Sequence, residues 1–176
     1  MQVAIIGAGP LGRRLALAAA RAGYGVLLED VMPSNLHHAQ EYLRQELGPA
    51  ALPSVRFVST IEEAVREADL AIDCVPDELE SKLEIFSLLD RMAPPKTVLL
   101  SPIKNTSIAD LASCTYRADK CVAVVADAKE LADGALREIL VRTPEQVADE
   151  TVRLVREFWE GLGFAVTHAT DGALRG

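Results

Sequence analysis

Residues 3–30 read VAIIGAGPLGRRLALAAARAGYGVLLED, and this stretch decides the fold class. Four apolar residues lead into a turn with glycine at Gly7, Gly9 and Gly12. An alanine- and leucine-rich segment follows, and a second apolar run then ends in an acidic pair. The order strand, glycine turn, helix, strand and acid is typical of a βαβ unit that holds the diphosphate of a dinucleotide.

Each part of this unit has a physical task. The glycines allow a tight turn, close approach of a diphosphate and close packing of helix on strand, and the helix start offers free N–H groups. Asp30 lies about twenty residues further on, where a carboxylate accepts hydrogen bonds from ribose hydroxyls and repels a 2′-phosphate. Glu29, its neighbour on the strand, faces the opposite way. We therefore expect NAD to be bound by Gly7, Gly9, Pro10, Leu11, Gly12 and Asp30. A structural turn and an S-adenosylmethionine site are the alternatives.

The rest of the chain alternates short apolar runs with segments of helical period, which indicates repeated β–α units. We expect an α/β fold of the Rossmann type, with a doubly wound, mainly parallel sheet and helices on both faces. No linker or repeat interrupts the pattern, so residues 1–176 are expected to form a single dinucleotide-binding domain. The expected strands span residues 3–6, 25–29, 55–58, 70–75, 97–100, 121–125, 137–141 and 165–167.

Local signals indicate where several helices begin. Thr60 has the capping-box spacing to a glutamate three residues later. Ser34 is expected to cap a helix that ends at Gly48. Thr143 is expected to cap the last helix, with Pro144 at its first position.

Composition excludes several classes of function. A net charge of −8 and a pI near 4.9 disfavour nucleic acid as a partner, because such binding relies on phosphate neutralisation. No apolar run approaches the length that spans a membrane. Cys74, Cys114 and Cys121 are odd in number and lie in or beside apolar runs, which favours a reducing cytoplasm. The adjacent His37 and His38 point in different directions on a helix, so we expect no metal site.

Three stretches carry a resemblance to a known family: IIGAGPLGRRLALAAARAGYGVLLED (5–30), ADLAIDCVPDELESKLEIFSLLDRMAPPKTVL (68–99), and SIADLAS followed by TYRADKCVAV (107–124). From residue 1 to about 171 the chain resembles the NAD-binding domain of the 3-hydroxyacyl-CoA dehydrogenase family. The resemblance implies an oxidoreductase-like Rossmann domain, NAD as cofactor, acyl-CoA as substrate class and a place in fatty acid metabolism.

The resemblance also implies roles for residues that follow the fourth strand. The family has an acid there and a lysine five positions later, which correspond to Asp77 and Lys82 in VPDELESK. Asp77 would lie near the nicotinamide end of the cofactor, Lys82 near cofactor or CoA substrate, and Val75 beside the cofactor. A helix start that favours carboxylates, followed by a solvated lysine, explains the same residues without a function.

The next motif of the family is altered in this chain. The family has asparagine-threonine-serine-serine after the fifth strand, but here Pro102 stands at the asparagine and Lys104 at the substrate-binding serine. Proline has neither an N–H nor a side-chain amide. A lysine in an apolar cleft can have its pKa lowered and act as a base. Lys104, Asn105 and Ser107 therefore remain as weak catalytic candidates, although Ser107 also fits a helix cap.

The general base of the family is missing at its expected position. The family has a histidine at the end of the sixth strand, where this chain has Val125, and an asparagine where it has Ala128. Valine cannot take the proton of a hydroxyl group. Glu138 falls near the glutamate that orients the histidine, and without that partner it reads as a surface carboxylate.

We therefore expect an NAD(H)-binding protein that lacks the serine- and histidine-based catalysis of the family. The alternative is an active 3-hydroxyacyl-CoA or hydroxy-acid oxidoreductase, completed by a partner chain or by shifted residues around Lys104. The sequence ends where the family continues into a helical domain. No helical C-terminal domain is expected within these residues, and a natural absence and a truncation of a longer chain both explain this. Self-association is a further expectation, through an apolar stripe at Val152, Val155, Phe158 and Trp159 that core packing also explains.

Overall fold

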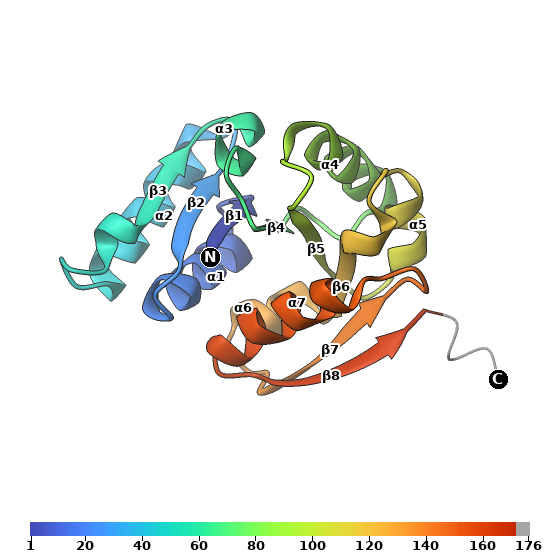
Figure 1. The fold of residues 1–176 in the computed structure, drawn as a ribbon. Coiled ribbons are helices and arrows are strands. Elements are labelled where there is room, and N and C mark those ends of the chain that lie inside the picture. The colour runs from blue at the N-terminus through green and yellow to red at the C-terminus, as the bar shows by residue number, and fades with distance from the viewer. Residues whose placement is uncertain (172–176) are drawn as a thin grey trace.

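The structure of the protein is a computed structural model that describes residues 1–171. All eight of its strands join one sheet in the order β3-β2-β1-β4-β5-β6-β7-β8 (Figure 1). Neighbouring strands are parallel except β6 and β7, which are antiparallel. The strands are β1 (Gln2–Ile6), β2 (Gly25–Glu29), β3 (Val55–Val58), β4 (Leu70–Asp73), β5 (Val98–Ile103), β6 (Cys121–Val125), β7 (Glu138–Thr143) and β8 (Ala165–Thr170).

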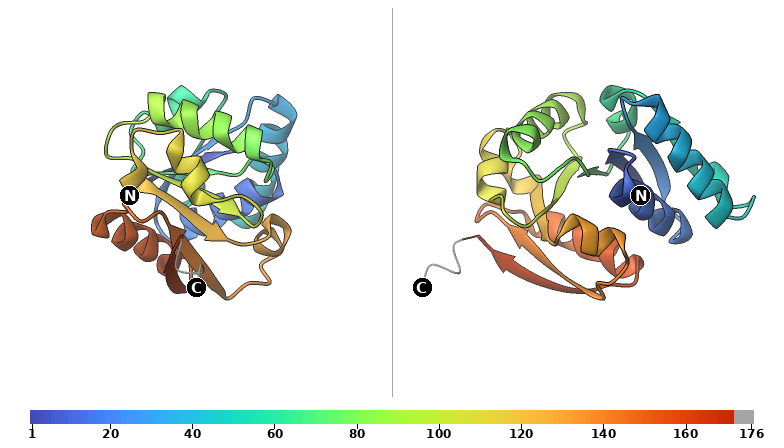
Figure 2. Two further views of the ribbon diagram at one scale, coloured as in Figure 1. Left: turned by 90° about the vertical axis from the view of Figure 1, so that its right-hand side faces the viewer. Right: turned by 180° about the vertical axis from the view of Figure 1, so that it is seen from behind.

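Helices cover both faces of the sheet (Figures 1 and 2). Side chains of α1, α2, α6 and α7 join the apolar core on one face, and those of α3, α4 and α5 join the core on the other. The expected doubly wound, mainly parallel α/β fold is therefore confirmed. The helices are α1 (Pro10–Arg21), α2 (Pro33–Glu46), α3 (Ile61–Val65), α4 (Leu79–Met92), α5 (Ile108–Ser113), α6 (Ala128–Ala132) and α7 (Asp149–Gly161).

The order of the strands fixes where a ligand can bind. From β1 the chain proceeds outward to β2 and β3, then returns to β4 on the other side of β1. The connections after β1 and β4 therefore leave in opposite directions, which opens a crevice at the carboxyl ends of these two strands. Within residues 1–171, no helix combines the length and the apolar character that crossing a membrane requires.

Strand β4 is shorter, and β5 longer, than the sequence suggests. The expectation of a strand to residue 75 is wrong, because the N–H of Val75 donates to the Asp73 carboxylate at 3.0 Å and the ladder ends at Asp73. The expected end of the fifth strand at residue 100 is also wrong, because β5 continues through Pro102 to Ile103, paired with β6. The missing N–H of Pro102 costs the β4–β5 ladder nothing, since that ladder ends at Leu100.

The second helix begins and ends earlier than expected. Ser34 does not cap it, because α2 begins at Pro33 with Met32 at the N-cap. Proline fits the first helical position because its fixed φ is preorganised for a helix. The helix ends at Glu46, because the next residue is already extended.

The expected start of the last helix at Thr143 is wrong. Thr143 is the last residue of β7, fully buried, and pairs with Thr170 of β8. Its hydroxyl lies 2.9 Å from Nε2 of His168. Pairing with a strand more than twenty residues away overrides the local capping signal, and α7 begins only at Asp149.

Other local signals are confirmed. The Thr60 hydroxyl accepts the N–H of Glu63 at the start of α3. Ser107 caps α5 by accepting the N–H groups of Ala109 and Asp110. Most of the apolar stripe of α7 belongs to the core, since Val155, Phe158 and Trp159 have no exposed surface, while Val152 is half-buried.

One buried guanidinium ties α4 to β5. Arg117 donates to the carboxylate of Asp90 at 2.8 Å and to the backbone oxygens of Asp90, Ala93, Pro94 and Thr97. These carbonyls include groups at the end of α4, which have no partner within the helix. The side chains of the ion pair are 10% and 7% exposed, so water cannot replace the lost contacts.

We predict that Arg117→Ala lowers the free energy of unfolding by about 3–5 kcal/mol, because it leaves a buried carboxylate and several carbonyls without a donor. Urea unfolding measures this loss. The matched control is Arg44→Ala, whose ion pair with Glu41 is exposed and whose loss should cost under about 1 kcal/mol. Equal losses for the two variants would contradict the role assigned to Arg117.

A second buried charge lies at the end of β2. Glu29 is 3% exposed, and its Oε1 has no hydrogen-bond partner among the described residues. Burial, with a smaller contribution from the charge of Asp30, raises the pKa of Glu29 to about 7. A carboxyl whose pKa is raised by folding destabilises the fold progressively as pH rises from its unfolded pKa to its folded pKa.

We predict that Glu29→Gln stabilises the protein at pH 8 by up to about 3 kcal/mol, the cost of ionising the native carboxyl at neutral pH and above. The gain should shrink toward zero as pH falls from 7 to below 5, where the native glutamate is protonated. Urea unfolding at pH 8 and pH 5 measures both values. A gain that does not change with pH would contradict the assignment, and exposed Glu67→Gln serves as the control.

Candidate functional site

A groove of about 620 Å³ lies at the crevice between β1 and β4, within the size range of small-molecule sites. Its walls are the glycine turn, the end of β2, the residues after β4, and helix α6. Six residues proposed from sequence as cofactor contacts line it: Gly7, Gly9, Pro10, Leu11, Asp30 and Val75.

The glycine turn has the geometry of a phosphate cradle. Gly7 has a φ of +104°, a conformation that favours glycine, and its N–H donates to the backbone carbonyl of Glu29 at 2.8 Å. A Cβ on Gly12 would lie 1.7 Å from the Gly7 oxygen, so this position requires glycine for α1 to approach β1. A Cβ on Gly9 would meet nothing within 4 Å. The space in front of Gly9 and the N-terminal end of α1 therefore fits a diphosphate.

Asp30 is held against the glycine turn. Its Oδ2 accepts the Ala8 N–H at 2.9 Å and the Asn35 amide at 3.1 Å, and its Oδ1 accepts the Met32 N–H at 2.9 Å. A carboxylate offers about four acceptor positions, so Asp30 can still accept a ribose hydroxyl. Asn35 also lines the groove, and the sequence did not single it out.

Lys82 is buried beneath the groove and does not line it. The side chain is 1% exposed, and its Nζ donates to Asp73 at 3.3 Å, to the Val75 oxygen at 3.2 Å and to Ser101 at 2.9 Å. These three bonds use all the donors of an ammonium group. In this structure Lys82 supports the turn after β4 from below.

Asp77 holds the loop that follows β5. Its carboxylate accepts the N–H groups of Lys104 at 2.8 Å and Asn105 at 3.2 Å, and the Thr106 hydroxyl at 2.8 Å. Partial burial works to raise the pKa of Asp77, but these donors and the charge of Lys82 outweigh it and lower the pKa. Asp77 is therefore ionised at neutral pH, with both oxygens bonded to the chain itself.

The weak catalytic candidates do not form a cluster. Lys104 is exposed, with its ammonium 4.0 Å from the Asp127 carboxylate. The Ser107 hydroxyl caps α5 and donates to Asp171 at 3.1 Å. Glu138 is exposed at the start of β7. Val125 ends β6, and its side chain has no group that accepts a proton.

Helix α6 was missed by the sequence analysis, although Asp127 and Glu130 have capping-box spacing that could have revealed it. The Asp127 carboxylate accepts the N–H groups of Lys129 and Glu130. Ala128, Lys129 and Ala132 of α6 line the groove, together with Asp133, which follows the helix.

Two further wall residues come from the turn after β4. Cys74 and Pro76 line the groove between the glycine turn and Asp77. Burial raises the pKa of the Cys74 thiol far above neutrality, so it offers no thiolate for nucleophilic chemistry.

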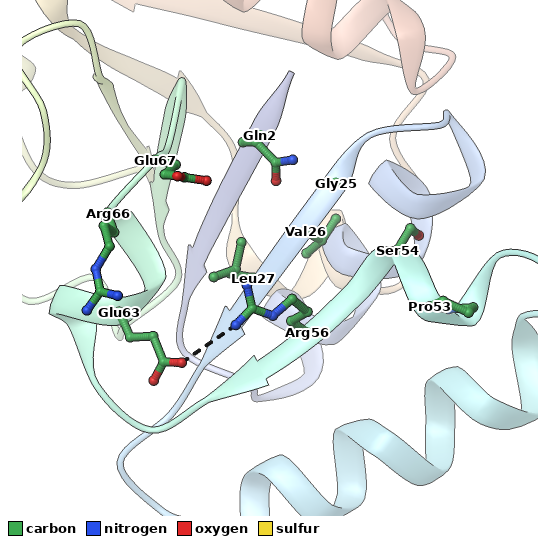
Figure 3. A pocket seen from close by; sticks show the side chains of 10 residues that line it. All are labelled: Gln2, Gly25, Val26, Leu27, Pro53, Ser54, Arg56, Glu63, Arg66 and Glu67. Atoms are coloured by element: carbon green, nitrogen blue, oxygen red, sulfur yellow. Dashed lines mark ion pairs between the residues drawn. The ribbon is translucent and has the colours of Figure 1, made fainter.

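A second hollow of about 370 Å³ lies near the amino ends of β1 and β2 (Figure 3). It is bordered by Gln2 and Gly25, the first residues of β1 and β2, and by the Arg56–Glu63 ion pair. Ligands of doubly wound sheets bind at the carboxyl ends of the strands, so this hollow is not the candidate cofactor site.

Comparisons with known proteins agree with this geometry. The family described as "3-hydroxyacyl-CoA dehydrogenase, NAD binding domain" matches residues 2–171. A probable 3-hydroxybutyryl-CoA dehydrogenase of Bacillus subtilis is 29% identical over 134 residues, which cover 69% of this chain and 46% of that protein. A 5-formyl-3-hydroxy-2-methylpyridine 4-carboxylate 5-dehydrogenase of Mesorhizobium japonicum is 33% identical over 120 residues, covering 62% of this chain and 38% of that protein.

A solved structure of the same family has a similar fold. The 3-hydroxyacyl-CoA dehydrogenase of Archaeoglobus fulgidus superposes with a TM-score of 0.81 and 25% identity, over 99% of this chain and 58% of that one. The chain thus spans less than half of the length of the two curated relatives. The glycine turn, Asp30, the switch-point groove and the family match together identify NAD as the cofactor. The chain belongs to the 3-hydroxyacyl-CoA dehydrogenase family and carries the NAD-binding domain of that family.

Proposed function

We propose that the chain binds NAD or NADH on the glycine turn and does not carry out the serine- and histidine-dependent oxidation of 3-hydroxyacyl-CoA. The observation that carries this proposal is the groove at the glycine turn together with Val125, which cannot accept a proton, at the carboxyl end of β6. Oxidation of a secondary alcohol needs a group that takes the hydroxyl proton, and Val125 stands where the family has that group.

The residues near this edge do not replace the missing base. The Lys104 side chain is 57% exposed, and its ammonium lies 4.0 Å from the Asp127 carboxylate, so it does not occupy an apolar cleft of the kind that activates a lysine. Asp77 is ionised, but both of its oxygens accept hydrogen bonds from residues 104–106, and it does not line the groove. When bound, NAD supplies the hydride acceptor; this chain supplies the diphosphate cradle and the ribose carboxylate.

We predict that 3-hydroxybutyryl-CoA and NAD give no NADH above background with this chain, measured as absorbance at 340 nm. The physical reason is the missing proton acceptor. Steady turnover that disappears in Lys104→Ala would contradict the proposal and favour the alternative in which Lys104 serves as the base.

We also predict that NADH binds at least tenfold more tightly than NADPH, because Asp30 repels a 2′-phosphate. Asp30→Ala should weaken NADH binding about tenfold or more and reduce the preference over NADPH. Isothermal titration calorimetry measures both, with Glu84→Ala on the exposed side of α4 as the control. Tight binding of S-adenosylmethionine without NADH binding would overturn the cofactor assignment.

Several wider expectations remain proposals. All described strands join one sheet, which supports one domain over residues 1–176. The family supports acyl-CoA as a second ligand and fatty acid metabolism as the setting. Free cysteines support a reducing cytoplasm. Self-association would need a surface other than the buried residues of α7, and sedimentation velocity would reveal it.

A further inference from the structure

The groove does not extend to Asp77 or to the loop after β5, where the family resemblance places the nicotinamide end of the cofactor. We propose that it recognises the adenosine diphosphate part of a dinucleotide and makes no selective contact with nicotinamide, so that NAD, NADH and ADP-ribose bind about equally. This inference rests on the proposed binding of NAD on the glycine turn. It adds the class of ligand to which the site responds.

The lining of the groove carries the first argument. Asp30 and Asn35 form one end, the glycine turn forms the floor, and the wall after β4 stops at Pro76. Among the described residues, none from 101 to 107 lines the groove. A ligand seated there touches groups that suit ribose and diphosphate, and the loop after β5 lies outside its walls.

The polar groups beyond the groove are already bonded to the chain itself. Both oxygens of Asp77 accept donors from residues 104–106. Ser101 is fully buried and donates to Asp73 at 3.3 Å while it accepts from Lys82. Pro102 brings no donor. Strong selection for one ligand over a close analogue requires site groups that lose a partner when the wrong ligand binds. These groups already have partners within the chain, and none of them lines the groove.

Helix α6 supplies the charge that the diphosphate needs. Lys129 is the cation in the lining of the groove. Within residues 1–171 it forms no ion pair. Neither Arg13 nor Arg14 of α1 lines the groove, and Arg14 packs over Gly134, where an added Cβ would lie 2.5 Å from its Nη2. A diphosphate is common to NAD, NADH and ADP-ribose, so Lys129 strengthens the binding of all three alike.

The test is isothermal titration calorimetry of the whole chain with NAD, NADH, ADP-ribose and nicotinamide mononucleotide at one ionic strength. The expected dissociation constants of the first three agree within about threefold, and nicotinamide mononucleotide gives no saturation at millimolar concentration. Lys129→Ala should weaken the first three by a similar factor of about five to ten. Lys104→Ala, which changes an exposed lysine outside the groove, should leave all three unchanged.

The possible outcomes separate this inference from the proposed function. NADH binding more than tenfold tighter than ADP-ribose would overturn the inference and leave NAD binding intact. So would saturable binding of nicotinamide mononucleotide, or a Lys129→Ala effect confined to NADH. If none of the ligands binds, the proposed function and the inference both fall. Thermal unfolding of each variant confirms that a lost signal does not come from a lost fold.

Discussion

The close contact between Gly12 and the Gly7 oxygen is the constraint on which the rest of the structure depends. A single methyl group at Gly12 would lie 1.7 Å from that oxygen, so only glycine lets α1 begin directly against the end of β1. This approach points the N-terminal end of α1 into the crevice between β1 and β4. It also brings the Ala8 N–H within 2.9 Å of Asp30, the residue that follows the neighbouring strand β2. The cradle and its acidic partner thus follow from one packing requirement.

The loops after β4, β5 and β6 are held by hydrogen bonds and an ion pair rather than by close packing. Three donors from residues 104–106 converge on Asp77, and Lys104 also faces Asp127 after β6. These contacts join the loops that follow β4, β5 and β6, because their polar groups bond to one another. An active site keeps polar groups available for a reacting substrate, whereas these groups are used to stabilise a loop. The fold of the family is retained here, and the polar groups of Asp77 and residues 104–106 bond to one another.

The sequence predicted what depends on neighbours along the chain. Each strand and the glycine turn came from short apolar runs and glycine spacing. The alternation of side chains also separated Asp30, which lines the groove, from Glu29, which is buried. Contacts between segments far apart in the sequence were not predicted. Nothing local indicates that Asp77 bonds a loop 27 residues away, or that Lys82 is buried beside Asp73 rather than solvated. Thr143 failed for the same reason, because its capping signal is local and its partner in β8 is not.

The central claim is that the chain has kept the diphosphate cradle and lost the reactive end of the site. A crystal structure at saturating NADH tests it most directly. The account predicts ordered density for adenosine and diphosphate over Gly7–Gly12, with the Asp77 contacts to residues 104–106 unchanged and the nicotinamide ring poorly ordered. A well-ordered nicotinamide held by Asp77, Lys82 or Lys104 would contradict it.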